Sequence, residues 1–161
     1  MKNRRRARFQ RILGQWLEEK GIWFDNKGAH SVGHDGHLYI QLEGTLYAAV
    51  PVEVKTSTHE EIVLYARDFE QYQNYYNLWI GKKIRTLYAF RKMGEEEWRF
   101  EFIDKLKRTD SGHPKLEYNR MRPIDAIVKE VRAFATAAKE VGRNKKESKT
   151  GDSKKRRGKQ N

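Results

Sequence analysis

The stretch that most constrains the fold of this chain is Val-Pro-Val-Glu-Val-Lys-Thr at residues 50–56. Its three valines alternate with other residues, and this period of two predicts a β-strand, because successive strand side chains point to opposite faces. The valines then share one face, and Glu53 and Lys55 share the other. We therefore expect a carboxylate and an ammonium group side by side on one face of a sheet.

A second acid, Asp35, stands in the turn-rich stretch Gly-His-Asp-Gly-His at residues 33–37. Residues 38–47 have the pattern of a hairpin with its turn at Glu-Gly, which would connect Asp35 to the strand of Glu53. We expect residues 25–37 to form an exposed loop that delivers Asp35 to this hairpin. The two acids can then converge, and two acids that hold a divalent cation beside a lysine suit phosphodiester hydrolysis.

Length and composition indicate one domain. The chain has 161 residues, 35% of them charged and 37% hydrophobic, enough for one real core. We expect a domain at 1–141, with a core at about 8–103 and a last helix at about 123–141, followed by a basic disordered tail at 142–161. The absence of cysteine excludes disulfides and thiolate metal sites. No apolar run reaches 18 residues, so we expect a soluble, cytoplasmic protein without a membrane partner.

The net charge of +12 is concentrated at the two ends. Residues 1–11 carry six bases and no acid, and residues 142–161 carry nine bases and two acids, so the middle of the chain is close to neutral. This pattern predicts flexible arms that neutralise DNA phosphates, and the alternative is that the ends only confer solubility or bind promiscuously. The candidate DNA-binding residues are Arg4, Arg5, Arg6, Arg8, Lys154, Lys155, Arg156 and Arg157.

Periodicity predicts the remaining elements of a mixed α/β fold. Apolar residues at helical spacing predict helices over 5–20, ended by Gly21, and over about 69–80, ended by Gly81. Residues 105–120 show no clear pattern, and Ser-Gly-His-Pro at residues 111–114 predicts a loop. The other expected elements are strands at 22–24, 62–65, 84–90 and 97–103 and a helix that begins at Pro123.

The order of helix, acidic loop, hairpin ending in Glu-Val-Lys, helix and strand hairpin resembles the PD-(D/E)XK nuclease superfamily, and within it the archaeal-type Holliday junction resolvases. The resemblance runs from Arg8 to Ile103, about 95 of the 161 residues. It includes Ile-Val-Leu-Tyr-Ala-Arg at residues 62–67 and Trp-Arg-Phe at residues 98–100. It implies a restriction-endonuclease-like core, in which a mixed central sheet is flanked by helices.

The same resemblance implies the roles of the site residues. Asp35 and Glu53 would bind Mg²⁺, with Mn²⁺ as an alternative ion, and the backbone carbonyl of Val54 would be a further ligand. Lys55 would orient or deprotonate the attacking water, or stabilise the developing negative charge. The alternative for Glu53 and Lys55 is a solvated, salt-bridged strand face, which contributes under about 1 kcal/mol.

Accessory residues leave several alternatives open. Resolvases of this type commonly carry a glutamate early in the first helix, whereas this chain has Gln10, so the number of metal ions and full activity are in question. Ser31 is a candidate phosphate contact by the same resemblance. Gln71-x-x-x-Tyr75 resembles an element of nucleases related to the RecB exonuclease, but the two residues are equally well explained as helix surface.

Three histidines surround Asp35 and add a further alternative. His30, His34 and His37 could form a transition-metal site, could contact phosphate, or could simply be exposed. His34 or His37 could also act as a general base, because an unperturbed imidazole has a pKa near 6.5.

Three functions follow from these observations. The first is an Mg²⁺-dependent endonuclease in DNA recombination and repair, which cuts four-way junctions or other branched DNA as a homodimer, since two symmetric nicks need two active sites. The second is a RecB-like or restriction-type nuclease that acts on linear DNA. The third is a non-catalytic DNA-binding protein on a nuclease scaffold.

Overall fold

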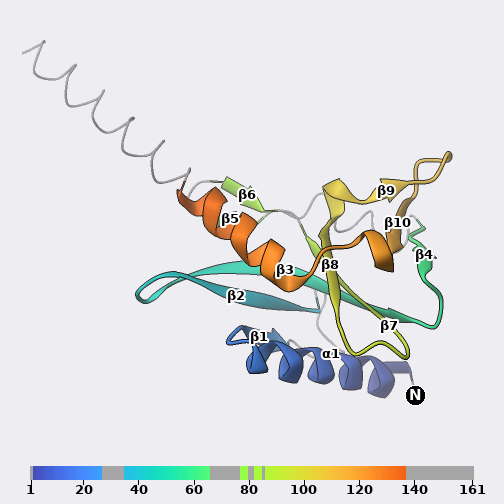
Figure 1. Cartoon of the computed structure of the whole chain (residues 1–161), viewed down its shortest axis with the longest axis horizontal. Helices are drawn as coiled ribbons and strands as arrows, with labels where there is room; N and C mark the ends of the chain where they lie inside the picture. The colour runs from blue at the N-terminus through green and yellow to red at the C-terminus, as the bar shows by residue number, and fades with distance from the viewer. Residues whose placement is uncertain (1, 27–34, 66–76, 80–81, 85, 137–161) are drawn as a thin grey trace, which may run out of the picture.

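The computed structural model describes residues 2–26, 35–65, 77–79, 82–84 and 86–136. These residues form a central five-stranded sheet, a long N-terminal helix, a later helix and a smaller sheet (Figure 1). Among the described residues, no helix is both long and apolar enough to span a bilayer. The expected α/β class with a mixed central sheet flanked by helices is confirmed.

The central sheet has the strand order β1-β2-β3-β7-β8. Three of its four pairings are antiparallel, and β3 pairs with β7 in parallel, so the sheet is mixed. The strand bounds are β1 (Trp23–Asn26), β2 (Gly36–Glu43), β3 (Leu46–Ser57), β7 (Leu87–Lys92) and β8 (Arg99–Phe102). The long β3 therefore lies in the middle of the sheet.

The β2–β3 hairpin confirms the expected hairpin and the strand of Glu53. Its register pairs Leu38 with Val50 and Gly36 with Val52. The turn contains Gly44, whose φ of 52° lies in the left-handed region that favours glycine. Val50, Val52 and Val54 are buried in the main core, as the alternation predicted.

Helix α1 (Lys2–Glu19) packs against β1 through its apolar residues, and Leu13 and Leu17 are fully buried. It ends at Gly21 with φ 76°, where the N–H of Ile22 donates to the carbonyl of Leu17 at 3.0 Å. The expected flexible N-terminal arm is wrong, since the basic residues from position 2 onward are helical. Arginine and lysine are good helix formers, and the buried face behind them anchors the helix.

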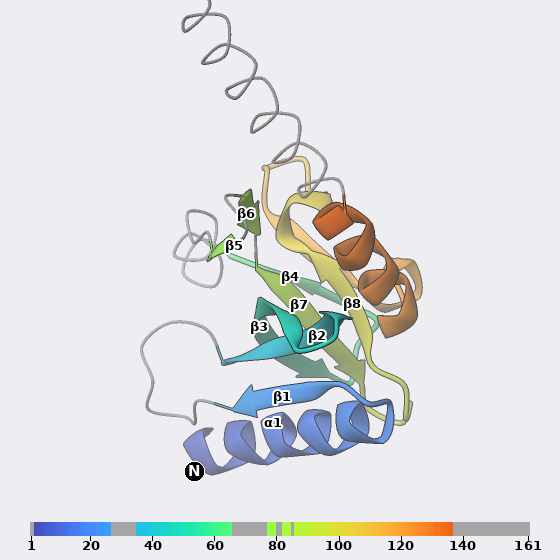
Figure 2. The ribbon, with the colours of Figure 1, turned by 90° about the vertical axis from the view of Figure 1, so that its left-hand side faces the viewer.

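A helix over 124–136 covers part of the central sheet and is drawn in orange in Figures 1 and 2. It begins directly after Pro123, as expected. Ile124, Ile127 and Val131 are buried in the same core as the β3 valines. The apolar face of this helix is therefore buried against the sheet and is not a free surface for a second subunit.

A second, three-stranded sheet contains one expected strand, at 61–63, and two short strands, at 107–108 and 114–117, from the stretch that showed no clear pattern. Its strand order is β4-β10-β9, and it encloses a second core with Tyr88 and Phe90 of β7. The strands at 107–108 and 114–117 have only two and four residues, too few to show a period, so no local pattern marks them. The bounds are β4 (Glu61–Val63), β9 (Lys107–Arg108), β10 (Pro114–Glu117) and the short helical turns η1 (Ile103–Lys105) and η2 (Tyr118–Arg120).

The helix expected over about 69–80 is wrong at its end. Residues 77–79 form β5 (Asn77–Trp79), which pairs with β6 (Lys82–Ile84) in a separate two-stranded sheet. Residues 66–76 lie outside the described residues. The aromatic periodicity therefore does not predict the strand that residues 77–79 form.

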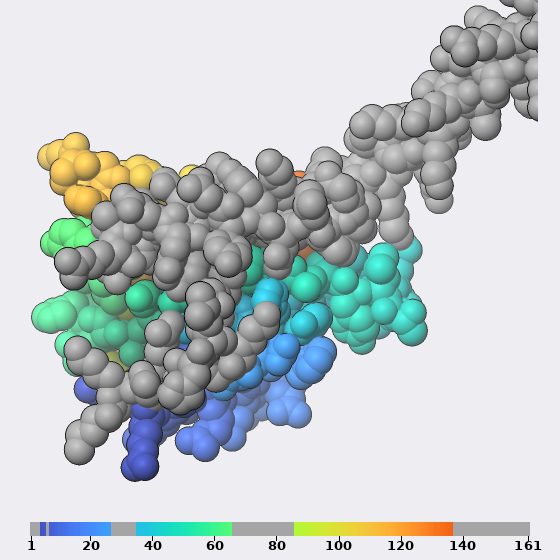
Figure 3. Space-filling model, turned by 180° about the vertical axis from the view of Figure 1, so that it is seen from behind, coloured from blue at the N-terminus to red at the C-terminus, as the bar shows by residue number. Residues whose placement is uncertain are grey.

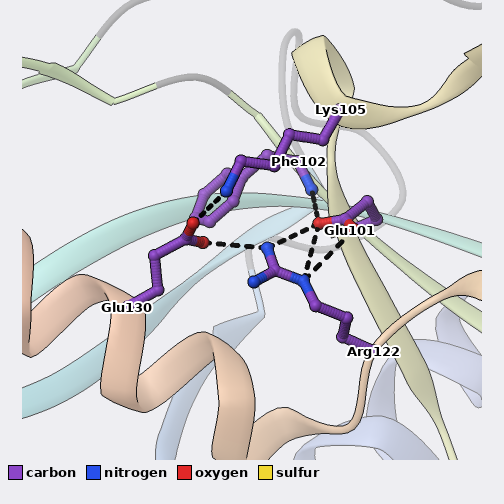
Figure 4. A network of polar contacts seen from close by, with 5 residues as sticks. All are labelled: Glu101, Phe102, Lys105, Arg122 and Glu130. Carbon is purple, nitrogen blue, oxygen red and sulfur yellow. Dashed lines mark hydrogen bonds and ion pairs between the residues drawn. The ribbon is translucent and has the colours of Figure 1, made fainter.

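The helix 124–136 is fixed to β8 by a charged network (Figure 4). Arg122 donates to Glu101 at 2.7 Å and to Glu130 at 2.9 Å, and Lys105 donates to the other oxygen of Glu130. The backbone of Arg122 also exchanges hydrogen bonds with Phe100 at 2.7 and 2.8 Å. Side chains and backbone together thus hold the start of the helix against the sheet.

This network makes stability depend on pH. Burial raises the pKa of the Glu130 carboxyl, but hydrogen bonds from Lys105 and Arg122 lower it by more, so the net pKa is below the ordinary value. Its stabilising contribution is present above the pKa of an unfolded glutamate, about 4.3, and is lost as the pH falls through the lower folded pKa. We expect the Glu130→Gln variant to lose less stability than the unaltered chain on acidification from pH 7, measured by urea midpoints. Equal acid losses in both proteins would contradict this.

Candidate active site

The β2–β3 hairpin brings Asp35 and Glu53 to the same end of two neighbouring strands. Asp35 directly precedes Gly36, and the partner of Gly36 across the ladder, Val52, directly precedes Glu53. Both acids are almost fully buried, with 3% and 2% of their surfaces exposed. Buried carboxylates are rare unless they are paired or bind a cation, so this pair is a candidate functional site.

Asp35 is held in place by two hydrogen bonds. The backbone N–H of Val54 donates to Oδ2 at 2.8 Å, and the Nε2 amide of Gln10 donates to Oδ1 at 2.9 Å. The first bond fixes the Asp35 carboxylate beside the peptide that follows Glu53. In an extended strand the N–H and C=O of one residue leave from the same edge, so the Val54 carbonyl also leaves β3 on the Asp35 side.

Gln10 belongs to this group, as its place in the sequence suggested. Its side chain comes from α1, is fully buried and bridges the helix to Asp35. Its Oε1 atom is also buried and accepts no hydrogen bond from the described residues. The Nε2 group of Gln10 already donates to Asp35. Its Oε1 atom therefore provides a neutral oxygen acceptor next to the two acids.

The donor set matches a hard divalent cation. Two carboxylates, a backbone carbonyl and an amide oxygen are all oxygen ligands, which Mg²⁺ and Mn²⁺ prefer. Within the described ranges no three His, Cys, Asp or Glu residues cluster as a metal site. The groups that could hold a cation at this position are the carboxylates of Asp35 and Glu53 and the neutral oxygens of Val54 and Gln10.

An open pocket of about 540 Å³ adjoins Glu53. Lys55, half-buried, lies two residues after Glu53 and therefore projects from the same face of β3. The pocket opens Glu53, Val54 and Lys55 to solvent, while Asp35 and Gln10 lie behind them and do not line it. It is lined by Arg5, Phe9, Glu53, Val54, Lys55, Thr56, Ser57, Thr58 and Met93.

Some of these lining residues were not expected from the sequence. Phe9 has the spacing of a core residue, and nothing in the sequence around Met93 points to the site. Arg5 was expected to contact DNA, and it lines the pocket from α1. Residues 56–58 are all hydroxyl residues, and two of the three belong to the end of β3.

The expected exposed loop over 25–37 is wrong at both ends. Asp25 and Asn26 belong to β1 and pair with His37 and Gly36 of β2. His37 is therefore a half-buried strand residue, not part of a loop around Asp35. The extra pairing arises because β1 extends along β2 as far as the residue next to Asp35.

The other predicted site residues lie outside the described part of the chain. The backbone of Arg6 is helical but its side chain is not described, and Arg4 and Arg8 are exposed on α1. The residues outside are Ser31, His30, His34, Gln71, Tyr75, Lys154, Lys155, Arg156 and Arg157.

Gly36 is required for the approach of β1 to Asp35. A Cβ atom at this position would lie 2.3 Å from the carbonyl oxygen of Asp25 and 2.7 Å from the ring of Phe24. Neither the strand backbone nor the buried ring can move away easily. Any larger residue would therefore separate β1 from β2 next to the acid pair.

We expect the Gly36→Ala variant to be less stable by about 2 kcal/mol, the usual cost of overpacking a filled site. Thermal unfolding measures this loss. Gly94→Ala is the comparison, because a Cβ atom at position 94 meets no atom within 4 Å, and that variant tests only the cost of a positive φ. A Gly36→Ala protein as stable as the unaltered chain would show that β1 does not pack here as described.

Comparison with known proteins yields a similarity of fold. No protein-family model matches the sequence, and a comparison with curated proteins also gave no match. Among solved structures, the fold is similar to that of Hjc, a Holliday junction resolvase from Archaeoglobus fulgidus, with a TM-score of 0.55 and 20% sequence identity over 75% of this chain and 98% of that chain. The chain therefore has the fold of an archaeal junction resolvase, with a buried acid pair at the end of its central hairpin.

Proposed function

We propose that this chain is a divalent-cation-dependent endonuclease that hydrolyses DNA phosphodiester bonds at branched DNA, four-way junctions above all. The observation that carries the proposal is the position of Asp35, whose carboxylate accepts a hydrogen bond from the peptide next to Glu53. The similarity of the fold to a Holliday junction resolvase supports the choice of substrate. The basic residues exposed on α1 support DNA as the partner.

Each residue has a role in this proposal. Asp35 and Glu53, with the Val54 carbonyl, hold Mg²⁺ or Mn²⁺, and Gln10 orients Asp35. When bound, the cation supplies a Lewis acid that offsets negative charge on the phosphate. Lys55 orients or deprotonates the attacking water, or stabilises the developing charge, from the same face of β3.

The pocket beside Glu53 suits a phosphodiester. Arg5 offers a positive charge, and the hydroxyls of Thr56, Ser57 and Thr58 offer hydrogen bonds to phosphate oxygens. None of these groups reads a base edge. Selection of the substrate would therefore depend on the shape of the DNA and on backbone contacts, as expected for an enzyme that recognises a branch.

A homodimer is part of this proposal. A junction is resolved by two symmetric nicks, which need two active sites related by a two-fold axis. The helix 124–136 does not offer its apolar face for this contact, because that face is buried against the sheet.

One observation favours a second candidate, a non-catalytic DNA-binding protein on a nuclease scaffold. Asp35 already accepts a hydrogen bond from the neutral amide of Gln10, so part of its cost of burial is offset without any cation. On this alternative the chain binds branched DNA and does not cut it.

The deciding experiment incubates the full chain with a synthetic four-way junction, a linear duplex and a single strand, each with Mg²⁺, Mn²⁺ or EDTA. The proposal predicts paired nicks at symmetric positions of the junction and none with EDTA. Progressive shortening of the linear duplex would instead indicate a RecB-like or restriction-type nuclease. Binding to the junction without cleavage in either metal would favour the non-catalytic alternative.

A further inference from the structure

A second concave surface lies on the other side of Gln10. It is a groove of about 720 Å³ between α1 and β1, and Gln10 forms part of its wall. We call it the α1–β1 groove. It is lined by Arg4, Ala7, Arg8, Gln10, Arg11, Gly14, Gln15, Glu18, Trp23, Phe24 and Asn26.

Three arginines give this groove a positive wall. Arg4, Arg8 and Arg11 are spaced by four and three residues, so they follow one face of α1, and all three are exposed. Glu18 is the only acid among the lining residues. At a rise of 1.5 Å per residue the arginines span about 10 Å, the length of roughly three phosphates along one DNA strand.

Trp23 contributes an aromatic surface to the same groove. It is the most exposed large hydrophobic residue of the described chain, at 64%. Its ring stacks on that of Tyr39 in β2, with ring centroids 4.5 Å apart and an interplanar angle of 25°. Because this stack already orders the indole, a planar partner that binds its other face loses little conformational entropy of the side chain.

A nucleic-acid strand offers both groups that this surface fits, a planar base for the exposed indole and phosphates for the three arginines. Bases inside a duplex are covered on both faces by their neighbours, so only an unpaired base can use Trp23. We propose that the α1–β1 groove binds an unpaired stretch of DNA strand, with phosphates against Arg4, Arg8 and Arg11 and a base on Trp23. The identity of the nucleic acid as DNA rests on the proposed function.

Gln10 connects this groove to the acid pair. It lines the groove and donates to Asp35, so this one side chain of α1 lies between the groove and the acid pair. Figure 3 shows the blue surface of α1 and β1 adjoining that of the β2–β3 hairpin. On this proposal, an unpaired strand in the groove lies one side chain away from Asp35, and the substrate is branched DNA with unpaired nucleotides near the bond that is cut.

The first test measures binding of the full chain to a short oligothymidylate and to a duplex of equal length, in EDTA, by fluorescence anisotropy. Base stacking is typically lost about tenfold or more on alanine substitution, so Trp23→Ala should weaken single-strand binding by that factor and leave duplex binding unchanged. Trp23→Phe should keep most of the affinity and lose the quenching of tryptophan fluorescence by the oligonucleotide. Tyr65→Ala is the matched control, because Tyr65 is 61% exposed and lies outside the groove.

The second test uses salt. Replacing Arg4, Arg8 and Arg11 with glutamine should reduce the slope of log K against log salt by about 2, since each phosphate contact on a single strand contributes about 0.7. The control replaces three exposed bases outside the groove, Lys107, Arg120 and Lys129.

Unchanged single-strand affinity in Trp23→Ala, or an equal loss for the duplex, would overturn the inference. So would a chain that does not bind the oligothymidylate. Trp23 is exposed, and circular dichroism of both Trp23 variants shows whether the fold is intact. EDTA prevents cleavage in all these assays, so their outcome does not depend on nuclease activity. A chain that cuts no DNA would refute the proposed function and would leave the binding result unaffected.

Discussion

Replacing Glu53 with glutamine is expected to lower Mg²⁺-dependent cleavage of a four-way junction about a thousandfold or more and to leave junction binding in EDTA unchanged. Glutamine has the size of glutamate but no charge, so the variant keeps the packing of a side chain that is 2% exposed. A cation held by one carboxylate in place of two binds weakly and is poorly positioned. The loss of about 4 kcal/mol of transition-state stabilisation corresponds to three factors of ten in rate.

The measurement is a single-turnover cleavage rate with a labelled junction, alongside anisotropy for binding. Glu19→Gln is the matched control, because Glu19 is exposed at the far end of α1 and lines neither surface described above. Cleavage by Glu53→Gln at the rate of the unaltered chain would refute the acid pair as the catalytic centre.

Asp35→Asn is a less selective change than Glu53→Gln. Asp35 accepts hydrogen bonds at both carboxylate oxygens, from Gln10 and from Val54. Asparagine offers one oxygen and one NH₂ group, so one of the two donors loses its acceptor at a cost of about 1–3 kcal/mol. A loss of activity in Asp35→Asn could come from lost catalysis or from lost stability. The Glu53→Gln variant separates the two, so we use it for the test.

The hairpin was predictable from the sequence because the residues that alternate along the strand are also the residues that the core buries. The alternation of valines in 50–56 marks the face that the core buries, and the Glu-Gly turn fixes which residues pair. With register fixed, the approach of Asp35 to Glu53 follows from counting along two strands. The end of α1 was predictable for a similar reason, since Gly21 supplies the backbone conformation that ends a helix.

Only β4 of the small sheet was predictable, because β9 and β10 are very short and β4 lies far from β10 in the chain. Lys115 of β10 pairs with Val63 of β4, more than 50 residues earlier, and with Lys107 of β9. Two to four residues cannot show a period. What holds the sheet in place is burial of Leu116 and Tyr118 against Phe90, a contact that no local pattern announces.

The roles of Gln10 and Trp23 were also beyond the sequence. Position 10 was expected near the site by resemblance, but the direction of its amide toward Asp35 depends on how α1 packs on β1. Trp23 and Phe24 are neighbours of similar hydrophobicity, and alternation alone does not say which of the two faces the core. The structure buries Phe24 and exposes Trp23.

Gln10→Glu is expected to make stability depend on a divalent cation. In the unaltered chain Nε2 of Gln10 donates to Asp35, whereas a glutamate has no proton to donate and would place a second negative charge against that carboxylate. Position 10 is fully buried, so the charge is poorly solvated. We expect a loss of about 3 kcal/mol in EDTA at neutral pH, as for other buried charges that lack a partner.

Mg²⁺ should restore this stability, because it binds the folded acids and not the unfolded chain. At a cation concentration one hundred times the dissociation constant the gain is about 2.7 kcal/mol, nearly the whole loss. Thermal unfolding in EDTA and in Mg²⁺ measures the difference, and Gln15→Glu, on an exposed position of the same helix, should change stability by less than about 0.5 kcal/mol in either condition. A Gln10→Glu protein that unfolds at the same temperature with and without Mg²⁺ would show that Asp35 and its neighbours do not hold a cation, whatever the DNA they bind. Recovery by Mg²⁺ would establish the metal site without any measurement of cleavage. The repulsion between Asp35 and a second carboxylate falls only when a proton or a cation binds, and the pH is held constant.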